Sequence, residues 1–323
     1  MRILVTGATS LLGRTTAQKL IESGHAVTVL QRHPSGLGCT EVLADIRDTD
    51  AVRRALAGCD AVVHLAAKVG ITGPARDYAE INVTGTATLL EASRRAGVSK
   101  FVHVSSPSVA HSGHPLVGAP AGPADPSTAR SAYSRTKAQA ELLALDADST
   151  DLAVVVIRPH LVWGPGDTQL VGRIVARARA GRLVLIDDGC ALIDTTYIDN
   201  AADSLVAALT HGPGGRVFVV SNGQPRMVAD LLAGIARAAG APPPHRRVPF
   251  PVAWSAGAVV SGAWSLLRRP GDPPMTTFLA EQLGTAHWFD QREVRTALQW
   301  QPRVGIDEGL EQLAAWYANH PMA

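Results

Sequence analysis

The stretch LVTGATSLLG, residues 4–13, decides the predicted fold, because an apolar run is followed by a glycine turn and the start of a helix. Gly7 and Gly13 stand where a loop of the form G-x-x-G-x-x-G has its first and last glycines, and Ser10 replaces the middle one. Gly7 permits a tight turn, and Gly13 permits close packing of helix on strand. The helix N-terminus then offers free N–H groups to a pyrophosphate. We predict a dinucleotide site that also includes Thr9, Leu11 and Leu12, with the Ser10 hydroxyl as a candidate phosphate ligand.

Beyond this unit, short apolar runs alternate with helical patterns. This alternation is typical of parallel strands that helices cover on both faces. We expect strands at 3–5, 26–30, 41–44, 61–65, 101–105 and 152–157, and helices at 11–23, 49–57, 77–96 and 134–147. The predicted fold class is α/β, a doubly wound parallel (Rossmann) sheet with a smaller C-terminal α/β substrate lobe. The dinucleotide-binding domain is expected at 1–165, with 194–220 returning to it, and the lobe mainly at 166–193 and 221–323.

The composition narrows the range of partners and compartments. The chain has 323 residues, an apolar fraction of 46% and a net charge of +2, which is typical of a folded protein and gives no reason to expect nucleic acid. Cys39, Cys59 and Cys190 are few, odd in number and not spaced for a metal, so we expect a reducing cytoplasm and no metal site. A strand pattern starts at once, so no signal peptide is expected.

The end of the second expected strand bears on the choice of cofactor. An acidic residue there would bond the ribose hydroxyls of NAD. The sequence TVLQRHP, residues 28–34, instead places Gln31 and Arg32 at this point. An uncharged residue followed by a guanidinium suits a 2′-phosphate, so we favour NADP(H), while NAD(H) stays open. The alternative is that Arg32 is a solvated surface charge.

Two further motifs carry chemistry. FVHVSSPSV, residues 101–109, ends a strand with Ser105 and Ser106, and SAYSRTKAQAE, residues 131–141, begins a helix with Tyr133 and Lys137. Residues four apart lie on one face of a helix. We expect the Lys137 ammonium to lower the pKa of Tyr133 so that the phenol exchanges a proton, while a serine hydroxyl holds the substrate oxygen.

With these motifs, the chain resembles the extended short-chain dehydrogenases/reductases of the NAD-dependent epimerase/dehydratase type, over nearly its whole length. The resemblance lies in TGATSLLG (6–13), ADIRD (44–48), HLAA (64–67), NVTGT (82–86), SSPSV (105–109), YSRTK (133–137) and RPHLVWGPGD (158–167). It implies Ser106 as the catalytic serine, because it stands three residues before Val109, together with Tyr133 and Lys137. It also implies that Asp45 and Ile46 contact the adenine of the cofactor, and that Pro159, His160 and Val162 lie beside the nicotinamide. Further cofactor contacts are implied at Leu65, Ala66, Ala67, Asn82, Val104 and Ser105. The departure at Ser10 leaves the phosphate geometry open.

Within this family the reaction type depends on other segments. The Asp-Glu pair of sugar-nucleotide dehydratases is missing, since the position reads SPS. AHWFDQREVRTALQWQP, residues 286–302, and the apolar segment before it are similar to the branch of 3β-hydroxysteroid dehydrogenases and 2-alkyl-3-oxoalkanoate reductases. We therefore favour an oxidoreductase that interconverts a ketone and a secondary alcohol on an apolar 3-oxoacyl or sterol-like substrate. A nucleotide-sugar epimerase with retained NAD and a non-catalytic dinucleotide-binding regulator are the alternatives.

The remaining features have several interpretations. The uncharged stretch 252–267 could line an apolar cleft, lie on a membrane surface as part of 248–269, or be a buried core helix. We expect His111 and His114 in a substrate loop at 107–130, and we expect Asp187 and Asp188 in a turn. Tyr197, Asp199 and Asn200 are expected to be architectural, and a homodimer is left open.

Overall fold

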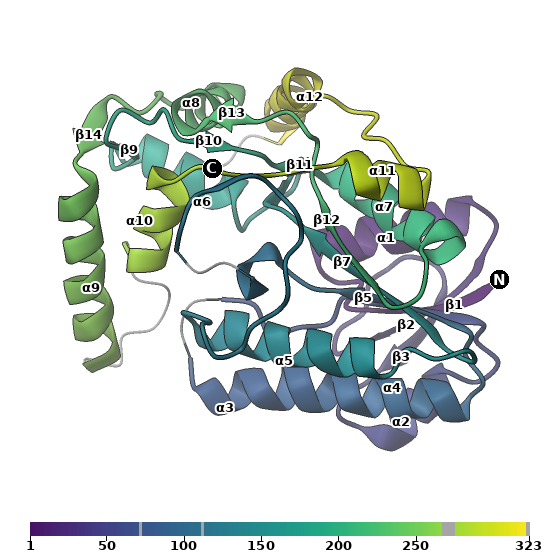
Figure 1. The fold of residues 1–323 in the computed structure, drawn as a ribbon. Helices are drawn as coiled ribbons and strands as arrows, with labels where there is room; N and C mark the ends of the chain where they lie inside the picture. The colour runs from purple at the N-terminus through teal and green to yellow at the C-terminus, as the bar shows by residue number, and fades with distance from the viewer. Residues whose placement is uncertain (71–72, 111–112, 267–274, 321–323) are drawn as a thin grey trace.

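A computed structural model describes residues 1–323 except 71–72, 111–112, 267–274 and 321–323. Its central sheet has seven parallel strands in the order β12-β7-β5-β4-β1-β2-β3 (Figure 1). The order reverses around β1, which confirms the predicted doubly wound sheet. The strands are β1 (Arg2–Thr6), β2 (Ala26–Gln31), β3 (Thr40–Leu43), β4 (Ala61–His64), β5 (Lys100–Val104), β7 (Ala153–Pro159) and β12 (Arg216–Val220).

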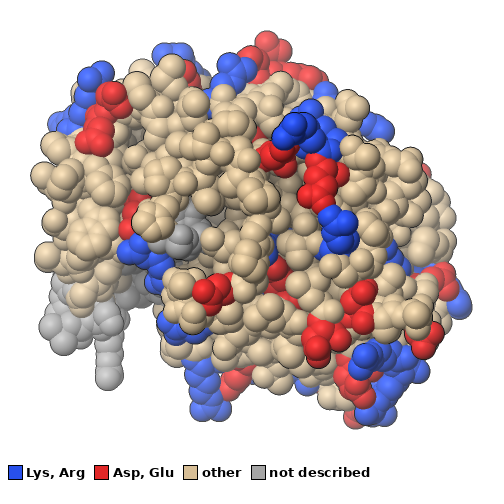
Figure 2. All heavy atoms as spheres, viewed as in Figure 1, with Lys and Arg blue, Asp and Glu red and all other residues tan. Residues whose placement is uncertain are grey.

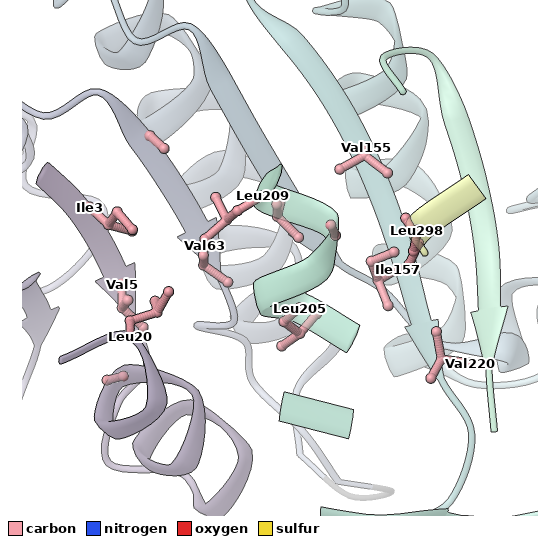
Figure 3. Close-up of a cluster of buried hydrophobic side chains, with 14 of the residues drawn as sticks. Ile3, Val5, Leu20, Val63, Val155, Ile157, Leu205, Leu209, Val220 and Leu298 are labelled. Carbon is pink, nitrogen blue, oxygen red and sulfur yellow. The ribbon is translucent and has the colours of Figure 1, made fainter. Parts of the chain in front are cut away.

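Helices cover both faces of this sheet, because strands buried on both sides need an apolar layer above and below. One face carries α1 (Leu11–Glu22), α7 (Ile198–His211) and α11 (Arg292–Leu298), and the other carries α2 (Thr49–Ala55), α4 (Gly85–Arg95) and α5 (Ala132–Asp146). Side chains of the first face, among them Leu20, Leu205 and Leu298, pack on Val63 and Ile157 of the strands (Figure 3).

The long helix expected at 77–96 is present but is not a regular α-helix throughout. It consists of α3 (Ala75–Tyr78), a π-helical turn at Ala79–Thr84 and α4. Because such turns insert an extra residue, they change which side chains face the sheet, and sequence periodicity cannot locate them. The turn contains Asn82, which is buried.

A second apolar core joins α6 (Val171–Arg179), α8 (Val228–Ala238) and α12 (Ile306–Asn319). A smaller sheet of order β13-β10-β15-β6 lies beside it, with β13 (Arg226–Met227), β10 (Leu192–Ile193), β15 (His287–Phe289) and β6 (Leu116–Ala119). Two strand pairs, β8 (Val162–Trp163) with β11 (Thr196–Tyr197) and β9 (Val184–Ile186) with β14 (Arg246–Val248), and helices α9 (Phe250–Leu266) and α10 (Thr277–Gly284) complete the lobe.

The uncharged stretch forms most of α9, and its last residue, Leu267, lies outside the described residues. The helix is not the buried core helix that was one of the alternatives. Only Ala253 and Gly257 of its first ten residues are buried, whereas Val252 and Val259 are 56% and 72% exposed. Among the residues that the structure describes, no helix is both long and apolar enough to cross a membrane.

The minor predictions have mixed outcomes. Asp187 and Asp188 lie in a turn, as expected, and Asp187 accepts a hydrogen bond from the Phe250 N–H. Asn200 is buried and bonded to the backbone near Val304, which fits an architectural role. His111 lies outside the described residues, and no group of metal-ligating side chains occurs in the described part of the chain.

Candidate functional site

The phosphate loop connects β1 to α1, and its glycines are needed for close backbone contacts. Gly7 has φ +77°, a left-handed conformation that favours glycine, and a Cβ there would lie 2.9 Å from the Ala66 nitrogen. A Cβ at Gly13 would lie 2.3 Å from the Gly7 carbonyl oxygen. The lack of a side chain at Gly13 therefore lets the first turn of α1 lie against the Gly7 backbone, in addition to the predicted packing of the helix on the strand.

The Ser10 hydroxyl, a candidate phosphate ligand, is hydrogen-bonded within the loop itself. Ser10 is the N-cap of α1, and its hydroxyl accepts a hydrogen bond from the Gly13 N–H at 3.1 Å and donates one to the Gly7 carbonyl at 2.8 Å. The hydroxyl thus closes the loop on itself. The backbone at Leu11 and Leu12, at the positive end of the helix dipole, remains available to an anion.

A cleft of about 880 Å³ opens above the carboxyl ends of the strands. This is where doubly wound sheets bind their ligands. Nineteen of the predicted site residues line the cleft: Gly7, Thr9, Ser10, Leu11, Leu12, Gln31, Arg32, Asp45, Ile46, Leu65, Ala66, Ala67, Val104, Ser105, Ser106, Tyr133, Lys137, Pro159 and Val162. Lys68, Val69, Ile81, Leu161 and Asp167 also line it and were missed. The first three lie outside the quoted motifs, whereas Leu161 and Asp167 belong to RPHLVWGPGD, a motif in which only Pro159, His160 and Val162 were selected.

Three predicted residues do not line the cleft, namely Gly13, Asn82 and His160. His160 is 5% exposed, and its Nε2 lies 2.8 Å from Nδ1 of His287. The ring therefore contacts the lobe rather than the space where the nicotinamide was expected. Asn82 is 1% exposed and is bonded entirely within the protein.

The far end of the cleft has the features of an adenosine site. Gln31 is 6% exposed, and neither of its amide atoms has a hydrogen-bond partner among the described residues. A buried amide that lines a cleft without a partner is suited to bonding ribose hydroxyls. Arg32 beside it is exposed and free to turn toward a phosphate.

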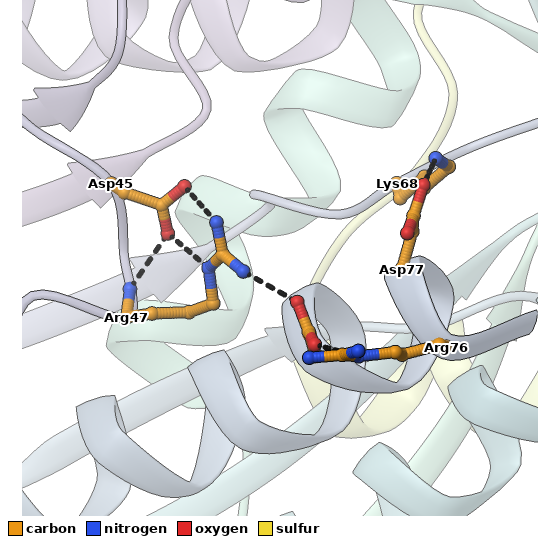
Figure 4. A network of polar contacts seen from close by, with 6 residues as sticks. Asp45, Arg47, Lys68, Arg76 and Asp77 are labelled. Carbon is orange, nitrogen blue, oxygen red and sulfur yellow. Dashed lines mark hydrogen bonds and ion pairs between the residues drawn. The ribbon is translucent and has the colours of Figure 1, made fainter. Parts of the chain in front are cut away.

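Asp45 at this end belongs to an ion-pair network (Figure 4). Its carboxylate accepts hydrogen bonds from the Arg47 side chain at 2.8 and 3.0 Å, and these bonds hold its pKa below the usual value. Arg47 also pairs with Glu80 at 2.7 Å. Lys68 pairs with Asp77 at 2.7 Å on the same side of the cleft. The network fixes the loop after β3 to the helix that bears the π-helical turn.

Ser106, Tyr133 and Lys137 converge at the middle of the cleft. Ser106 follows β5, its hydroxyl lies 3.0 Å from the Ser108 hydroxyl, and its side chain lies close enough to Tyr133 to act on the pKa of the phenol. Tyr133 and Lys137 lie one turn apart on α5, which begins at the Ser131 cap. Lys137 Nζ donates to the Val104 carbonyl at 2.5 Å, so the ammonium is held at the end of β5.

The expected effect of Lys137 on Tyr133 is wrong for this structure. Burial raises the pKa of Tyr133, and the neighbouring Ser106 side chain opposes that shift without reversing it. Burial also lowers the pKa of Lys137 to about 8, against the influence of Glu141. Tyr133 therefore keeps its proton at neutral pH, which is the form that a proton donor needs.

Comparisons with known proteins identify the family of this chain. The model of the NAD dependent epimerase/dehydratase family matches residues 3–221. The chain belongs to this family. This chain is 41% identical over 326 residues to a 2-alkyl-3-oxoalkanoate reductase of Stenotrophomonas maltophilia. The alignment covers 98% of this chain and 99% of that protein. The chain is also 29% identical over 340 residues to a 3 beta-hydroxysteroid dehydrogenase/Delta 5-->4-isomerase of Mycobacterium tuberculosis, over 98% and 90% of the two chains.

A solved structure shows the same fold. The crystal structure of UDP-glucuronic acid 4-epimerase from Bacillus cereus in complex with NAD has a TM-score of 0.77 and 23% identity, over 100% of both chains. The resemblance to the extended short-chain dehydrogenases/reductases is thus confirmed, and this family member is an NAD(P)-dependent oxidoreductase. Its cofactor is a nicotinamide dinucleotide, which fits the glycine loop and the partnerless amide of Gln31.

Proposed function

We propose that this protein interconverts a ketone and a secondary alcohol on an apolar substrate of the 3-oxoacyl or sterol-like class. The observation that carries the proposal is the convergence of the Ser106, Tyr133 and Lys137 side chains on one cleft. The names of the relatives, a 2-alkyl-3-oxoalkanoate reductase and a hydroxysteroid dehydrogenase, support the same reaction class.

The three side chains divide the work of moving one proton. In reduction, Tyr133 gives its phenolic proton to the carbonyl oxygen, and Ser106 hydrogen-bonds that oxygen as negative charge develops on it. The nicotinamide cofactor, when bound, supplies the hydride to the carbonyl carbon. Lys137 places a positive charge beside this pair, and its ammonium would also hold the cofactor ribose. In oxidation the same proton returns from the alcohol to Tyr133.

The substitution Tyr133→Phe tests this mechanism, because it removes the hydroxyl and keeps the packing of the ring. We expect folding and NADPH affinity to be nearly unchanged and the chemical step to slow by about 10²–10⁴-fold, the range for a positioned acid. The measurement is single-turnover oxidation of NADPH with a 3-oxoacyl compound. Near-normal turnover would show that Tyr133 is a packing residue and would remove the mechanism.

The preference for NADP(H) over NAD(H) is a finer proposal and rests on Gln31 and Arg32. The buried amide of Gln31 carries no charge that would repel a 2′-phosphate, and the exposed guanidinium of Arg32 can pair with one. In NAD-binding Rossmann sites an acidic residue at this strand end bonds the ribose hydroxyls, and its charge would repel a 2′-phosphate.

The alternative of a nucleotide-sugar epimerase is supported by the name of the family and by the shared fold with the Bacillus cereus epimerase. Turnover of UDP-sugars in a substrate panel, with none of 3-oxoacyl compounds or steroids, would decide for it. The assignment of 166–193 and 221–323 to substrate binding, the catalytic serine and the homodimer stay predictions.

Helix α9 supports a second proposal, contact with a lipid surface. It carries no charged side chain, its exposed arc includes Val252 and Val259, and its face in Figure 2, at the left edge, is uncharged. Residues 231–271 contain five arginines and no acidic residue, and Arg246 and Arg247 are exposed just before the helix. An apolar helix flanked by arginines suits an anionic interface.

Sedimentation with phosphatidylglycerol vesicles tests the lipid contact. Val259→Glu should weaken binding about tenfold or more, because it places a charge in the apolar arc. Leu142→Glu, at a 44% exposed position of α5, is the matched control and should bind as the wild type does. Equal binding by all three proteins, or no binding by the wild type, would contradict the proposal.

A further inference from the structure

The small sheet β13-β10-β15-β6 leaves one of its faces open to solvent, and that face is apolar. Its inward-pointing side chains include His287 of β15, which is buried, and side chains alternate along each strand. Leu192 precedes the β10 residue that pairs with His287, so it points outward, as does Met227 opposite it. Trp288 follows His287 and also points outward, and Val117 is exposed on the neighbouring strand β6. We call these four side chains, Val117, Trp288, Leu192 and Met227, the outer row.

A cavity of about 490 Å³ opens beside the outer row at Trp288. Its apolar walls are Trp288, Pro225 and Phe289, and Arg295 of α11 lies on its polar side. None of the described residues that line this cavity also lines the catalytic cleft. The volume is within the range of about 300–1,000 Å³ that is typical of small-molecule sites. The cavity is therefore a candidate binding site that is separate from the catalytic one.

Arg295 has no carboxylate partner among the residues that the structure describes. Its Nη2 donates to the Asn222 carbonyl at 3.2 Å, and its Nε is buried without a hydrogen-bond partner in the same part of the chain. Arg292, which also lines the cavity, differs because it pairs with Asp290 at 2.5 Å. A buried donor without a partner costs free energy, and a carboxylate would supply both a hydrogen bond and an opposite charge. The cavity thus contains a cation that is suited to an anionic ligand.

Gly223 makes room for this guanidinium in the cavity wall. Its φ is +67°, which favours glycine, and a Cβ there would lie 2.5 Å from Nη2 of Arg295. The amide of Gln291, another lining side chain, is already used, because its Oε1 accepts from the Ser221 N–H at 2.9 Å and its Nε2 donates to the Val219 carbonyl at 3.3 Å. Gln291 therefore does not compete with a ligand for Arg295.

We propose that this cavity is a second binding site, which takes the anion of a medium-chain alkyl carboxylic acid. The carboxylate pairs with Arg295, and the alkyl chain lies over Trp288 and along the outer row toward Met227. Two strand spacings, about 10 Å, separate β15 from β13, and an extended chain of about eight carbons spans this distance. The unpaired guanidinium selects the charge of the ligand, and the exposed apolar row selects its chain, because both gain from being covered. The site does not depend on the proposed ketone–alcohol chemistry.

Calorimetric titration of the NADPH-saturated protein with decanoate tests the site. The wild type should bind decanoate saturably, and it should bind acetate and decan-1-ol about tenfold or more weakly, because acetate lacks the chain and the alcohol lacks the charge. Equal binding of acetate would indicate an adventitious anion site only, and equal binding of decan-1-ol would indicate an apolar surface only. Either result, or no binding of decanoate, would overturn the inference.

The variant Arg295→Gln should weaken decanoate binding about tenfold or more, since it removes a charge-assisted pair. The matched control is Arg216→Gln. Arg216 pairs with Glu293 of the same helix α11 and does not line the cavity, so this variant loses one positive charge nearby and should bind decanoate as the wild type does. The variant Trp288→Ala should weaken the binding of decanoate and leave that of acetate unchanged, and it decides if Arg295→Gln does not fold.

Wild-type affinity for decanoate in Arg295→Gln or Trp288→Ala would show that decanoate binds elsewhere, for instance in the catalytic cleft, and would overturn the inference. An equal loss of affinity in Arg216→Gln would do the same, because it indicates attraction to net charge alone. A fast Tyr133→Phe variant would instead remove the proposed function and leave this site unaffected.

Discussion

Acidification should destabilise this protein because two histidines beneath the active site must remain neutral in the folded state. His64 and His103 lie on β4 and β5 with ring centroids 5.4 Å apart, and neither is more than 1% exposed. Burial, and secondarily the nearby Lys137, lowers the pKa of His64 from 6.5 to about 3. The same causes, together with His64, lower the pKa of His103 well below 6.5.

The sign and size of the effect follow from proton binding. The unfolded chain binds a proton on each ring near pH 6.5 and the folded chain does not, so stability is fully present above this pH and decreases as the pH falls. At pH 5, about 1.5 units below the unfolded pKa, His64 alone removes about 2 kcal/mol from the free energy of unfolding. Protonation of His103 in the unfolded chain also lowers the free energy of unfolding as the pH falls.

The assay is urea unfolding followed by tryptophan fluorescence at about pH 7.5, 6.5 and 5. His103→Leu removes one titrating ring whose nitrogens have no hydrogen-bond partner in the described part of the chain. The variant should reduce the dependence of the free energy of unfolding on pH and raise that free energy at the lowest pH. A wild-type protein with constant stability over this range, or a His103→Leu variant with the wild-type slope, would refute the reasoning.

Three further predictions concern the cleft. Arg32→Ala should weaken NADPH binding by about 1.5–3 kcal/mol, the range for hydrogen bonds to charged groups, and leave NADH binding nearly unchanged in fluorescence titrations; equal losses would contradict the NADP(H) preference. Gly13→Ala should raise the NADPH Kd about tenfold or more, because its Cβ would displace the Gly7 carbonyl, and a wild-type Kd would show that the loop can shift without cost. With 3-oxoacyl substrates of increasing length, the free energy RT ln(kcat/KM) should rise by at most about 0.8 kcal/mol per methylene, and a flat series would argue against an apolar pocket.

The sequence predicted the central sheet well, because fully buried parallel strands are continuous apolar runs between helices with clear caps. The cleft was also predicted well, since its glycines, serines and Tyr133 belong to motifs with a known mechanical purpose. What failed depended on side-chain contacts between distant segments. His160 pairs with His287, more than a hundred residues later, and no local pattern shows this. The shift of the Tyr133 pKa is set by burial, which spacing on a helix cannot report.

The buried hydrogen bonds that join His64 to Thr86, Thr86 to Asn82, and Asn82 to Lys68 and Thr136 were missed although most of these residues lie in quoted motifs. His64 begins the HLAA motif, and Asn82 and Thr86 lie in NVTGT, but the π-helical turn changes the register in which the second motif meets α5. Ordinary helical spacing would not turn Asn82 toward both Lys68 and Thr136. The motifs therefore indicated which residues matter, and only the folded chain shows their connections.

The position of β12 at the edge of the sheet has a consequence for how the chain is made. The strand β12 pairs with β7, although residues 160–215 lie between the two in the chain. This intervening segment forms β8–β11, α6 and α7. While the ribosome is still adding this segment, β7 has an open edge of unsatisfied N–H and C=O groups. The N-terminal region can begin to fold during synthesis, but its sheet is sealed only after Val220 has left the exit tunnel. Nascent chains stalled between these two strands should therefore be the ones most dependent on chaperones.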